Sequence, residues 1–258
     1  MKDIKIIVAT HKKYEMPLDN MYVPIFLGSA VNNAKNGVNY LHDDEGENIS
    51  DKNFSFCELT GLYWAWKHLK ADYIGIVHYR RHFRGSLFGN KFRKVLTSQQ
   101  ADKLLDNVSV LLPKRRHYYI ESNMSQYIHS HNSIALTETE FVIKRFYPDY
   151  ICSFNYIMKK TSGHRFNMFI MKYNIFYDYC KWLFDVLFKV EEKLDISTWS
   201  STEQRVYGYL GERLLDVWIH KNSIKYKDIP YMFMERQNWP KKILKFLLRK
   251  MKTGKDTV

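Results

Sequence analysis

A chain of 258 residues with 45% apolar side chains and a formal charge of +13 has the size and composition of one large globular domain, or of one domain with a small appendage. Gly and Pro are sparse and no internal repeat occurs, which excludes collagen-like, low-complexity and repeat proteins. The positive charge suits three classes of partner: nucleic acid, an anionic membrane surface, or a phosphorylated small molecule.

Three absences in the sequence narrow these classes. The cysteines Cys57, Cys152 and Cys180 are far apart and form no CxxC pair, which favours a reducing cytosol. Zinc-finger, recognition-helix and aromatic–basic RNA signatures do not occur, which argues against nucleic acid. The N-terminal apolar run is too short for a signal peptide, and no segment has the length and hydropathy of a membrane span. We therefore expect a cytoplasmic location.

The chain begins with a predicted strand. Residues 4–9 are apolar and β-branched, and they end at Thr10 and His11. Small and polar side chains at this point are typical of the entry to a nucleotide site, so both residues are candidate nucleotide contacts. Residues 13–50 are rich in turns, and we expect their acidic run, 43–47, to be an exposed loop.

Three pairs with capping-box spacing predict helix starts. We expect the first helix to continue to residue 69 and the third to residue 146. The pairs are Ser55 with Glu58, Thr97 with Gln100, and Thr137 with Glu140.

Residues 72–83 indicate where the site lies. An apolar run with Gly75 inside it predicts a short buried strand, and open α/β folds bind ligands at the carboxyl ends of such strands. Guanidinium groups suit an anion because they are planar and permanently charged. A solvated basic loop is the alternative. The residues at the strand end are His78, Arg80, Arg81 and His82.

The rest of the chain continues the alternation. Residues 108–112 and 166–171 predict strands, and amphipathic helices are expected around 182–194 and from 201 onward. The polar and aromatic segment 114–132 is expected to be an active-site loop region. Strands that alternate with helices predict an α/β fold with a largely parallel sheet.

The final residues, 239–258, differ in kind. Apolar side chains from Ile243 to Met251 share one helical face, and basic side chains lie largely off it. This pattern is typical of an interfacial membrane-binding helix. Each basic residue near an anionic leaflet contributes about 1 kcal/mol. A terminal helix packed on the domain is the alternative.

The carboxylates that could serve as a general base are Glu58, Asp195, Glu203, Glu212 and Asp216. Glu58 has the alternative of a capping role after Ser55, and Glu203 has the alternative of an acid in a first helical turn. Glu203 and Glu212 are nine positions apart, on opposite faces of one helix unless it ends between them. Glu203 shares the apolar stripe with Leu210, so we prefer it.

A divalent metal is left open. Mg²⁺ or Mn²⁺ often neutralises a departing diphosphate through carboxylates, but no Asp-x-Asp ends a strand here, and the nearest pair, Asp43 and Asp44, is in a loop. Either His78 helps to hold a metal or the arginines replace one. Histidines near strand ends are more often structural than ligands.

Several stretches together resemble a bacterial family long labelled a domain of unknown function (number 4422), whose members are regarded as glycosyltransferases. The combined set is specific and spans roughly residues 4–245. The stretches are Asn48–Ser50, Cys57–Thr60, Tyr63–Lys67, Asp72–Gly75, His78–Phe83, Thr161–Phe169, Glu212–Trp218 and Gln237–Trp239.

The resemblance implies a GT-A-like enzyme with a Rossmann-like nucleotide half, 1–112, an acceptor half, 113–238, and the basic tail, 239–258. Family members occur in capsule, exopolysaccharide and O-antigen clusters, and some transfer galactofuranose. The helix after the acceptor-side strand often carries the base or a sugar contact, which again favours Glu203. Trp64 and Trp66 are expected to stack on a ligand or simply to pack in the core.

We therefore predict a glycosyltransferase that moves a sugar from a UDP-sugar to a lipid-linked oligosaccharide at the inner face of the cytoplasmic membrane. A non-catalytic assembly protein of a polysaccharide cluster is the alternative. The predicted catalytic residues are Glu203 and His78. The predicted nucleotide contacts are Thr10, His11, Asn48, Asp72, Arg80 and Arg81. The predicted substrate contacts are His129, His131, His164, Arg165 and Asn167.

Overall fold

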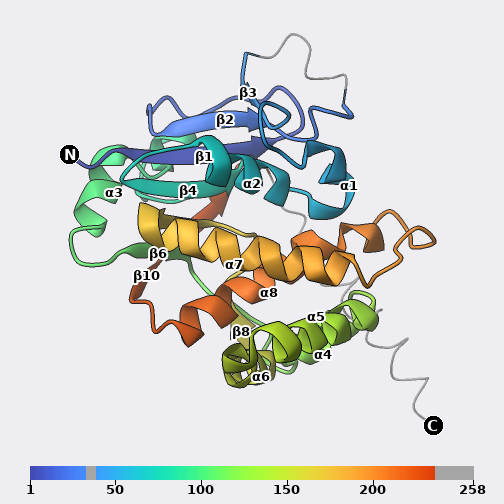
Figure 1. Ribbon diagram of the computed structural model, residues 1–258. Coiled ribbons are helices and arrows are strands. Elements are labelled where there is room, and N and C mark those ends of the chain that lie inside the picture. Colours follow the sequence, from blue (N-terminus) through green and yellow to red (C-terminus); the bar gives the residue numbers. More distant parts are fainter. Residues whose placement is uncertain (33–38, 236–258) are drawn as a thin grey trace.

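A nine-stranded sheet runs through the protein in the computed structural model, which describes residues 1–32 and 39–235 (Figure 1). Its strands are β1 (Ile4–Thr10), β2 (Tyr22–Phe26), β3 (Leu41–His42), β4 (Tyr73–His78), β5 (Arg81–Phe83), β6 (Val110–Pro113), β9 (Phe169–Lys172), β10 (Tyr226–Ile229) and β11 (Tyr231–Phe233). A separate pair consists of β7 (Arg116–His117) and β8 (Ser162–Gly163).

The main sheet has the order β10-β6-β9-β4-β1-β2-β3, and β5 and β11 extend it from the end of β4. The pairs β1–β2, β1–β4, β2–β3 and β6–β10 are parallel, whereas β9 is antiparallel to both of its neighbours. The α/β fold with a mostly parallel central sheet flanked by helices, expected for a GT-A-like domain, is confirmed.

The helices are α1 (Asn53–Phe56), α2 (Leu59–His68), α3 (Ser98–Leu104), α4 (Asn123–Ile128), α5 (Ser133–Phe146), α6 (Ile151–Lys159), α7 (Tyr173–Glu191) and α8 (Val206–Lys221). Figure 1 shows α7 lying across one face of the sheet, next to α8. The helices α4, α5 and α6 form a group on the side of α7 and α8 that is away from the sheet. Helix α5 contacts α7, and α6 contacts α8.

The core has two layers because the central strands are buried on both faces. Ile7 of β1 lies in one apolar cluster with Leu62 of α2 and Leu183 of α7. Its neighbours Ile6 and Val8 point to the other face, where they lie in the cluster that contains Leu96 and Ala101. Alternation of side chains along a strand therefore serves both layers. In β4, Gly75 allows close approach of β9, since a Cβ there would lie 2.7 Å from the Phe169 carbonyl oxygen.

Of the three predicted capping boxes, only the second is confirmed. Thr97 and Gln100 make both reciprocal hydrogen bonds at the start of α3. Ser55 instead donates its hydroxyl to the Lys52 carbonyl, and the helix predicted there is broken into α1 and α2 at Cys57, whose φ is +53°. Helix α5 begins at Ser133 and is capped by Asn132, so Thr137 lies inside the helix.

The acidic run 43–47 was expected to be an exposed loop, and for Asp43 this is wrong. Its buried carboxylate accepts hydrogen bonds of 2.5–2.9 Å from the backbone N–H groups of Gly28 and Ser29 and from the hydroxyls of Ser50 and Thr60. A carboxylate with four donors is well satisfied in the interior. Asp43 thus ties the segment after β2 to α2.

Other segments differ from their predictions in detail. The turn-rich segment 13–50 contains β2 and β3, and the expected loop 114–132 contains β7 and α4. Strands from residues 1–112 and 113–235 alternate within one sheet, because β9 lies between β4 and β6. No helix in residues 1–32 and 39–235 is long and apolar enough to cross a bilayer. The predicted basic tail, 239–258, lies outside the described residues.

Candidate active site

The carboxyl end of β4 holds His78 in a fixed orientation. Its Nε2 lies 2.6 Å from the Phe166 carbonyl oxygen, and since a carbonyl only accepts, Nε2 carries the proton and Nδ1 is left as an acceptor. Burial, reinforced by the charge of Arg81, lowers the pKa of His78 to about 3. The imidazole is therefore neutral at physiological pH.

Arg81 is positioned by aromatic rings rather than by a carboxylate. Its guanidinium carbon lies 3.9 Å from the ring centroid of Phe166 and 5.3 Å from that of Phe233, a favourable cation–π arrangement. Burial lowers the pKa of Arg81, and nearby Glu212 and Glu58 oppose that effect. Its Nε is buried and has no hydrogen-bond partner within the described chain. A charged group with an unused donor is suited to an incoming anion.

A second group of cations surrounds the Tyr79 ring. The guanidinium carbon of Arg80 lies 5.0 Å from the ring centroid and the Lys12 ammonium 5.3 Å from it. His11 meets the same ring edge-on, and its pKa is lowered by burial and then by Arg80, Lys12 and Arg205. Arg80 is also 3.7 Å from the Glu235 carboxylate, at an exposed position. The cations at the ends of β1 and β4 thus create a positive potential.

Two carboxylates lie near Arg81. Glu212 of α8 accepts hydrogen bonds from the Phe166 backbone N–H at 3.0 Å and from Arg213 at 3.1 Å, so each of its oxygens has a partner. Glu58 accepts a 2.7 Å hydrogen bond on Oε1 from Asn167. Burial raises the pKa of Glu58, while the bond from Asn167 and the charges of Arg205 and Arg81 act against that rise. Glu58 thus resembles a carboxylate tuned for proton transfer.

Backbone strain is concentrated at this site. Among the described residues, five other than glycine have positive φ, and three of them are Cys57 (+53°), Phe166 (+79°) and Asn167 (+50°). Such conformations cost about 1–3 kcal/mol each and often occur at functional sites. The turn at Cys57 puts Glu58 at the start of α2, and the turn at Phe166 and Asn167 brings their hydrogen-bonding groups to His78 and Glu58.

Glu203, the predicted base, is hydrogen-bonded within its own turn. It belongs to the short 3₁₀ helix η5 (Glu203–Arg205), and its carboxylate accepts hydrogen bonds from the backbone N–H and hydroxyl of Ser200. This is the first-turn role that was the alternative for Glu203. The 3₁₀ helix is followed directly by α8, which begins at Val206, so Glu203 lies just before the α-helix that carries Glu212. The geometry favours Glu58 over Glu203 as the base.

Asp72 cannot share a nucleotide site with Arg80 and Arg81. It precedes the amino end of β4 and accepts a hydrogen bond from the Asp3 backbone N–H, at the start of β1. A six-residue strand is about 20 Å long, so the two arginines are at its opposite end. Residues that are near in sequence thus lie far apart along an extended strand, and this geometry argues against Asp72 as a nucleotide contact.

Two other predicted nucleotide contacts act within their own loops. The Asn48 amide donates to the carbonyls of Asp44 and Gly46 and accepts from the Ser50 N–H. Thr10 is buried, and its hydroxyl donates to the Lys12 carbonyl, so it shapes the turn that presents Lys12. Of the predicted nucleotide contacts, His11, Arg80 and Arg81 are therefore the ones whose side chains meet at the strand ends.

His129 and His131, the predicted substrate contacts of segment 114–132, have different surroundings in the structure. His131 stacks on Tyr209 of α8 at 4.0 Å between ring centroids. Burial raises the pKa of Tyr209, and Arg205, Glu212 and Glu58 are its charged neighbours. His131 therefore borders the cluster. His129 instead pairs with Glu121 at 2.9 Å at the end of α4.

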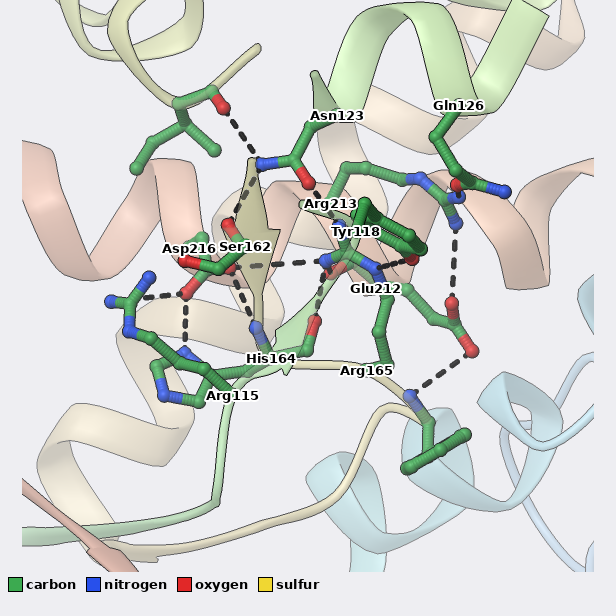
Figure 2. A network of polar contacts seen from close by, with 12 residues as sticks. Arg115, Tyr118, Asn123, Gln126, Ser162, His164, Arg165, Glu212, Arg213 and Asp216 are labelled. Carbon is green, nitrogen blue, oxygen red and sulfur yellow. Dashed lines mark hydrogen bonds and ion pairs between the residues drawn. The ribbon is translucent and has the colours of Figure 1, made fainter. Parts of the chain in front are cut away.

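His164 and Arg165 belong to a buried polar network behind the site (Figure 2). The two ring nitrogens of His164 lie 2.5 Å from Asp216 and 2.9 Å from Asp228. Arg165 donates to the Tyr118 hydroxyl, the His164 carbonyl and the Asn123 side chain. Both residues are almost fully buried. This geometry favours a structural role over the predicted substrate contacts.

The network predicts a pH-dependent stability. Burial, the largest influence, lowers the pKa of His164, but the charge and hydrogen bond of Asp216 and the hydrogen bond of Asp228 together raise it above the ordinary 6.5. Because the pKa of His164 is higher in the folded than in the unfolded chain, the charged imidazole stabilises the folded state below pH 6.5. This contribution is lost as pH rises through the folded-state pKa. We expect His164→Gln to lower the free energy of unfolding more at pH 6 than at pH 8, as measured by urea denaturation.

Comparing the variant with the parent at each pH removes the opposing effect of His78 and His82, whose pKa values are lowered by burial to about 3 and about 4. A variant difference that is constant across the range would contradict a charged His164.

The described residues hold no cluster of three or more His, Cys, Asp or Glu side chains that could bind a metal ion. His78 offers one nitrogen, Nδ1, and the bond to Phe166 occupies the other. These residues alone do not make a metal site.

Comparison with known proteins gives two matches. A family model described as "Domain of unknown function (DUF4422)" matches residues 5–223. A solved structure of the WbbM bifunctional glycosyltransferase in its apo form superposes with a TM-score of 0.82 and 27% sequence identity, over 90% of this chain and 45% of that chain. This chain thus spans less than half of that protein. No curated protein matches.

Proposed function

The chain belongs to the DUF4422 family, and from this premise we propose that it is a glycosyltransferase that uses a UDP-sugar. The observation that carries the proposal is that Arg81, whose Nε has no partner in the described chain, lies near Glu58, whose pKa is raised by burial, at the carboxyl end of β4. The likeness to a bifunctional glycosyltransferase supports it. The proposed acceptor is a lipid-linked oligosaccharide of capsule, exopolysaccharide or O-antigen synthesis, with galactose or galactofuranose as the transferred sugar.

In the proposed reaction, an acceptor hydroxyl attacks the anomeric carbon of the donor as the bond from that carbon to the diphosphate breaks. Glu58 takes the hydroxyl proton. Negative charge develops on the departing UDP as the bond to the diphosphate breaks. Arg81 and Arg80 would stabilise it as cations, and His11, whose pKa is lowered, would do so as a neutral hydrogen-bond donor. Preorganised cations in a partly dry site are effective because they need no rearrangement as the charge appears.

The basic tail, 239–258, is proposed to hold the protein at the inner face of the cytoplasmic membrane, near such an acceptor. His131, with Tyr209, would border the acceptor side. Asn167 is proposed to act through Glu58, because its amide also donates to the Gly208 carbonyl at 3.0 Å and so cannot rotate freely.

Calorimetric titration with UDP tests the proposal. We expect UDP to bind, and a panel of UDP-sugars with a lipid-linked acceptor then identifies the donor. If UDP fails to bind both with and without Mn²⁺, the transferase proposal is wrong, and a non-catalytic assembly role becomes the better explanation.

The two arginines make a matched pair for the same titration. Arg81→Gln should lower UDP affinity about 10- to 100-fold, because charge-assisted hydrogen bonds contribute about 1.5–3 kcal/mol. Arg80→Gln should lower UDP affinity only a fewfold, since Arg80 is exposed and forms an ion pair with Glu235. The reverse order would show that the diphosphate lies nearer to Arg80.

A further inference from the structure

Two adjacent apolar side chains project from the loop between β5 and α3. Leu87 and Phe88 are 67% and 83% exposed. Isolated exposed apolar residues are common on soluble proteins, but a pair of bulky ones at a loop tip forms a small apolar patch that calls for an explanation.

The loop is a built structure. Its ends are joined by an antiparallel bridge between Arg84 and Val95, and the backbone N–H groups of Gly85 and Ser86 donate to the Lys94 carbonyl. At the tip, the Asn90 side chain accepts from the Arg93 N–H at 2.9 Å. Compact closed loops of this kind are often functional.

All charged side chains of the loop are also basic. Residues 84–100 contain no Asp or Glu, and their charged side chains are Arg84, Lys91, Arg93 and Lys94. Lys91 donates to the Met234 carbonyl. The other three form no ion pair with any residue of the described chain, so their charges are available to an external partner. An apolar tip on a loop whose own charged side chains are all basic matches the chemistry of an anionic bilayer.

The position of the loop fits this partner. The Arg84 backbone N–H donates to the Pro230 carbonyl, directly before β11. The Met234 backbone N–H, directly after β11, donates to the Arg80 carbonyl at 2.9 Å. The loop and the cations around Tyr79 therefore lie in one region of the described chain.

We propose that residues 84–94 bind the surface of an anionic phospholipid bilayer, with Leu87 and Phe88 inserted at the headgroup boundary and the basic side chains against lipid phosphates. The loop is a second membrane contact, distinct from the tail. With both contacts made, the edge of the domain that carries Arg80 faces the bilayer. The proposal concerns binding and holds whether or not the protein transfers sugar.

Flotation of the full-length protein with vesicles tests it. We expect binding to vesicles that contain phosphatidylglycerol, weaker binding to pure phosphatidylcholine, and a loss at high salt. Leu87→Ala with Phe88→Ala should lower the partition coefficient at least about tenfold, because apolar area is no longer withdrawn from water, while UDP affinity stays unchanged. The matched control is Ile134→Ala with Phe141→Ala, two half-exposed apolar residues on α5, which should bind like the parent.

Because the tail stays in every variant, a direct depth measurement accompanies the partition. Phe88→Trp should gain fluorescence that brominated lipids quench, relative to the parent protein. Unchanged partition of the double variant together with no additional quenching in Phe88→Trp would overturn the proposal. A double variant that loses self-association in sedimentation, with vesicle binding intact, would assign the patch to a second copy of the chain instead.

Discussion

Glu58→Gln should lower the turnover of sugar transfer by about 10²- to 10⁴-fold, the usual contribution of a positioned general base, while UDP affinity stays close to that of the parent. Glutamine keeps the shape of the side chain and can still accept the Asn167 hydrogen bond, but it cannot take a proton. The measurement is kcat with saturating donor and acceptor, with calorimetry for UDP.

The pH profile gives this prediction a second readout. Because burial raises the pKa of Glu58, the parent should lose activity on the acid side at a pH above the ordinary value of 4.5 for glutamate, and the residual activity of Glu58→Gln should lack that limb. Glu203→Gln is the matched control, since it changes the same functional group in the Ser200 turn. A large loss in Glu203→Gln with little change in Glu58→Gln would restore the base predicted from the sequence.

The sequence was informative where a local pattern determines the structure. The central strands β1 and β4 were predicted because β-branched apolar runs of six or seven residues suit strands buried on both faces. The basic end of β4 was predicted because such a strand presents whatever follows it at the edge where ligands bind. The capping box of Thr97 and Gln100 was predicted correctly because such a motif is completed within four residues.

The predictions were wrong where contacts between residues far apart in the sequence determine the structure. The spacing of Ser55 and Glu58 predicts a cap, but Asn53 donates to the Cys57 carbonyl and the Thr60 hydroxyl and holds a turn that breaks the helix. That turn frees Glu58 for Asn167, 109 positions away. Nothing local to Glu58 signals this partner, and the same holds for the ring of Phe166 beneath Arg81.

The buried network also explains why a conspicuous segment was misassigned. His164 and Arg165 are polar and adjacent to a strand, as ligand-binding residues often are, yet their partners Asp216, Asp228 and Asn123 come from three other elements. A sequence lists the charges but not their pairing. The pairing decides whether a charged residue faces a ligand or the interior.

Asp216→Asn should lower the free energy of unfolding by about 3–5 kcal/mol, the usual cost of removing one partner from a buried ion pair. The Asp216 carboxylate is buried, accepts from the backbone and ring of His164, and lies within 4 Å of the guanidinium groups of Arg115 and Arg165. Asparagine would leave those buried positive charges without their counter-ion. Urea denaturation at pH 6 measures the loss, and Asp178→Asn, at an exposed position on α7, should cost little.

This loss should reach the active site, because the network anchors the segment that carries Phe166 and Asn167. Those two residues hold His78 and Glu58 through hydrogen bonds of 2.6 and 2.7 Å. If Asp216→Asn remains folded, we expect both turnover and UDP affinity to fall, because Phe166 also supports the Arg81 guanidinium. A stability change below about 1 kcal/mol, as for an ordinary surface substitution, would show that the network does not carry the segment.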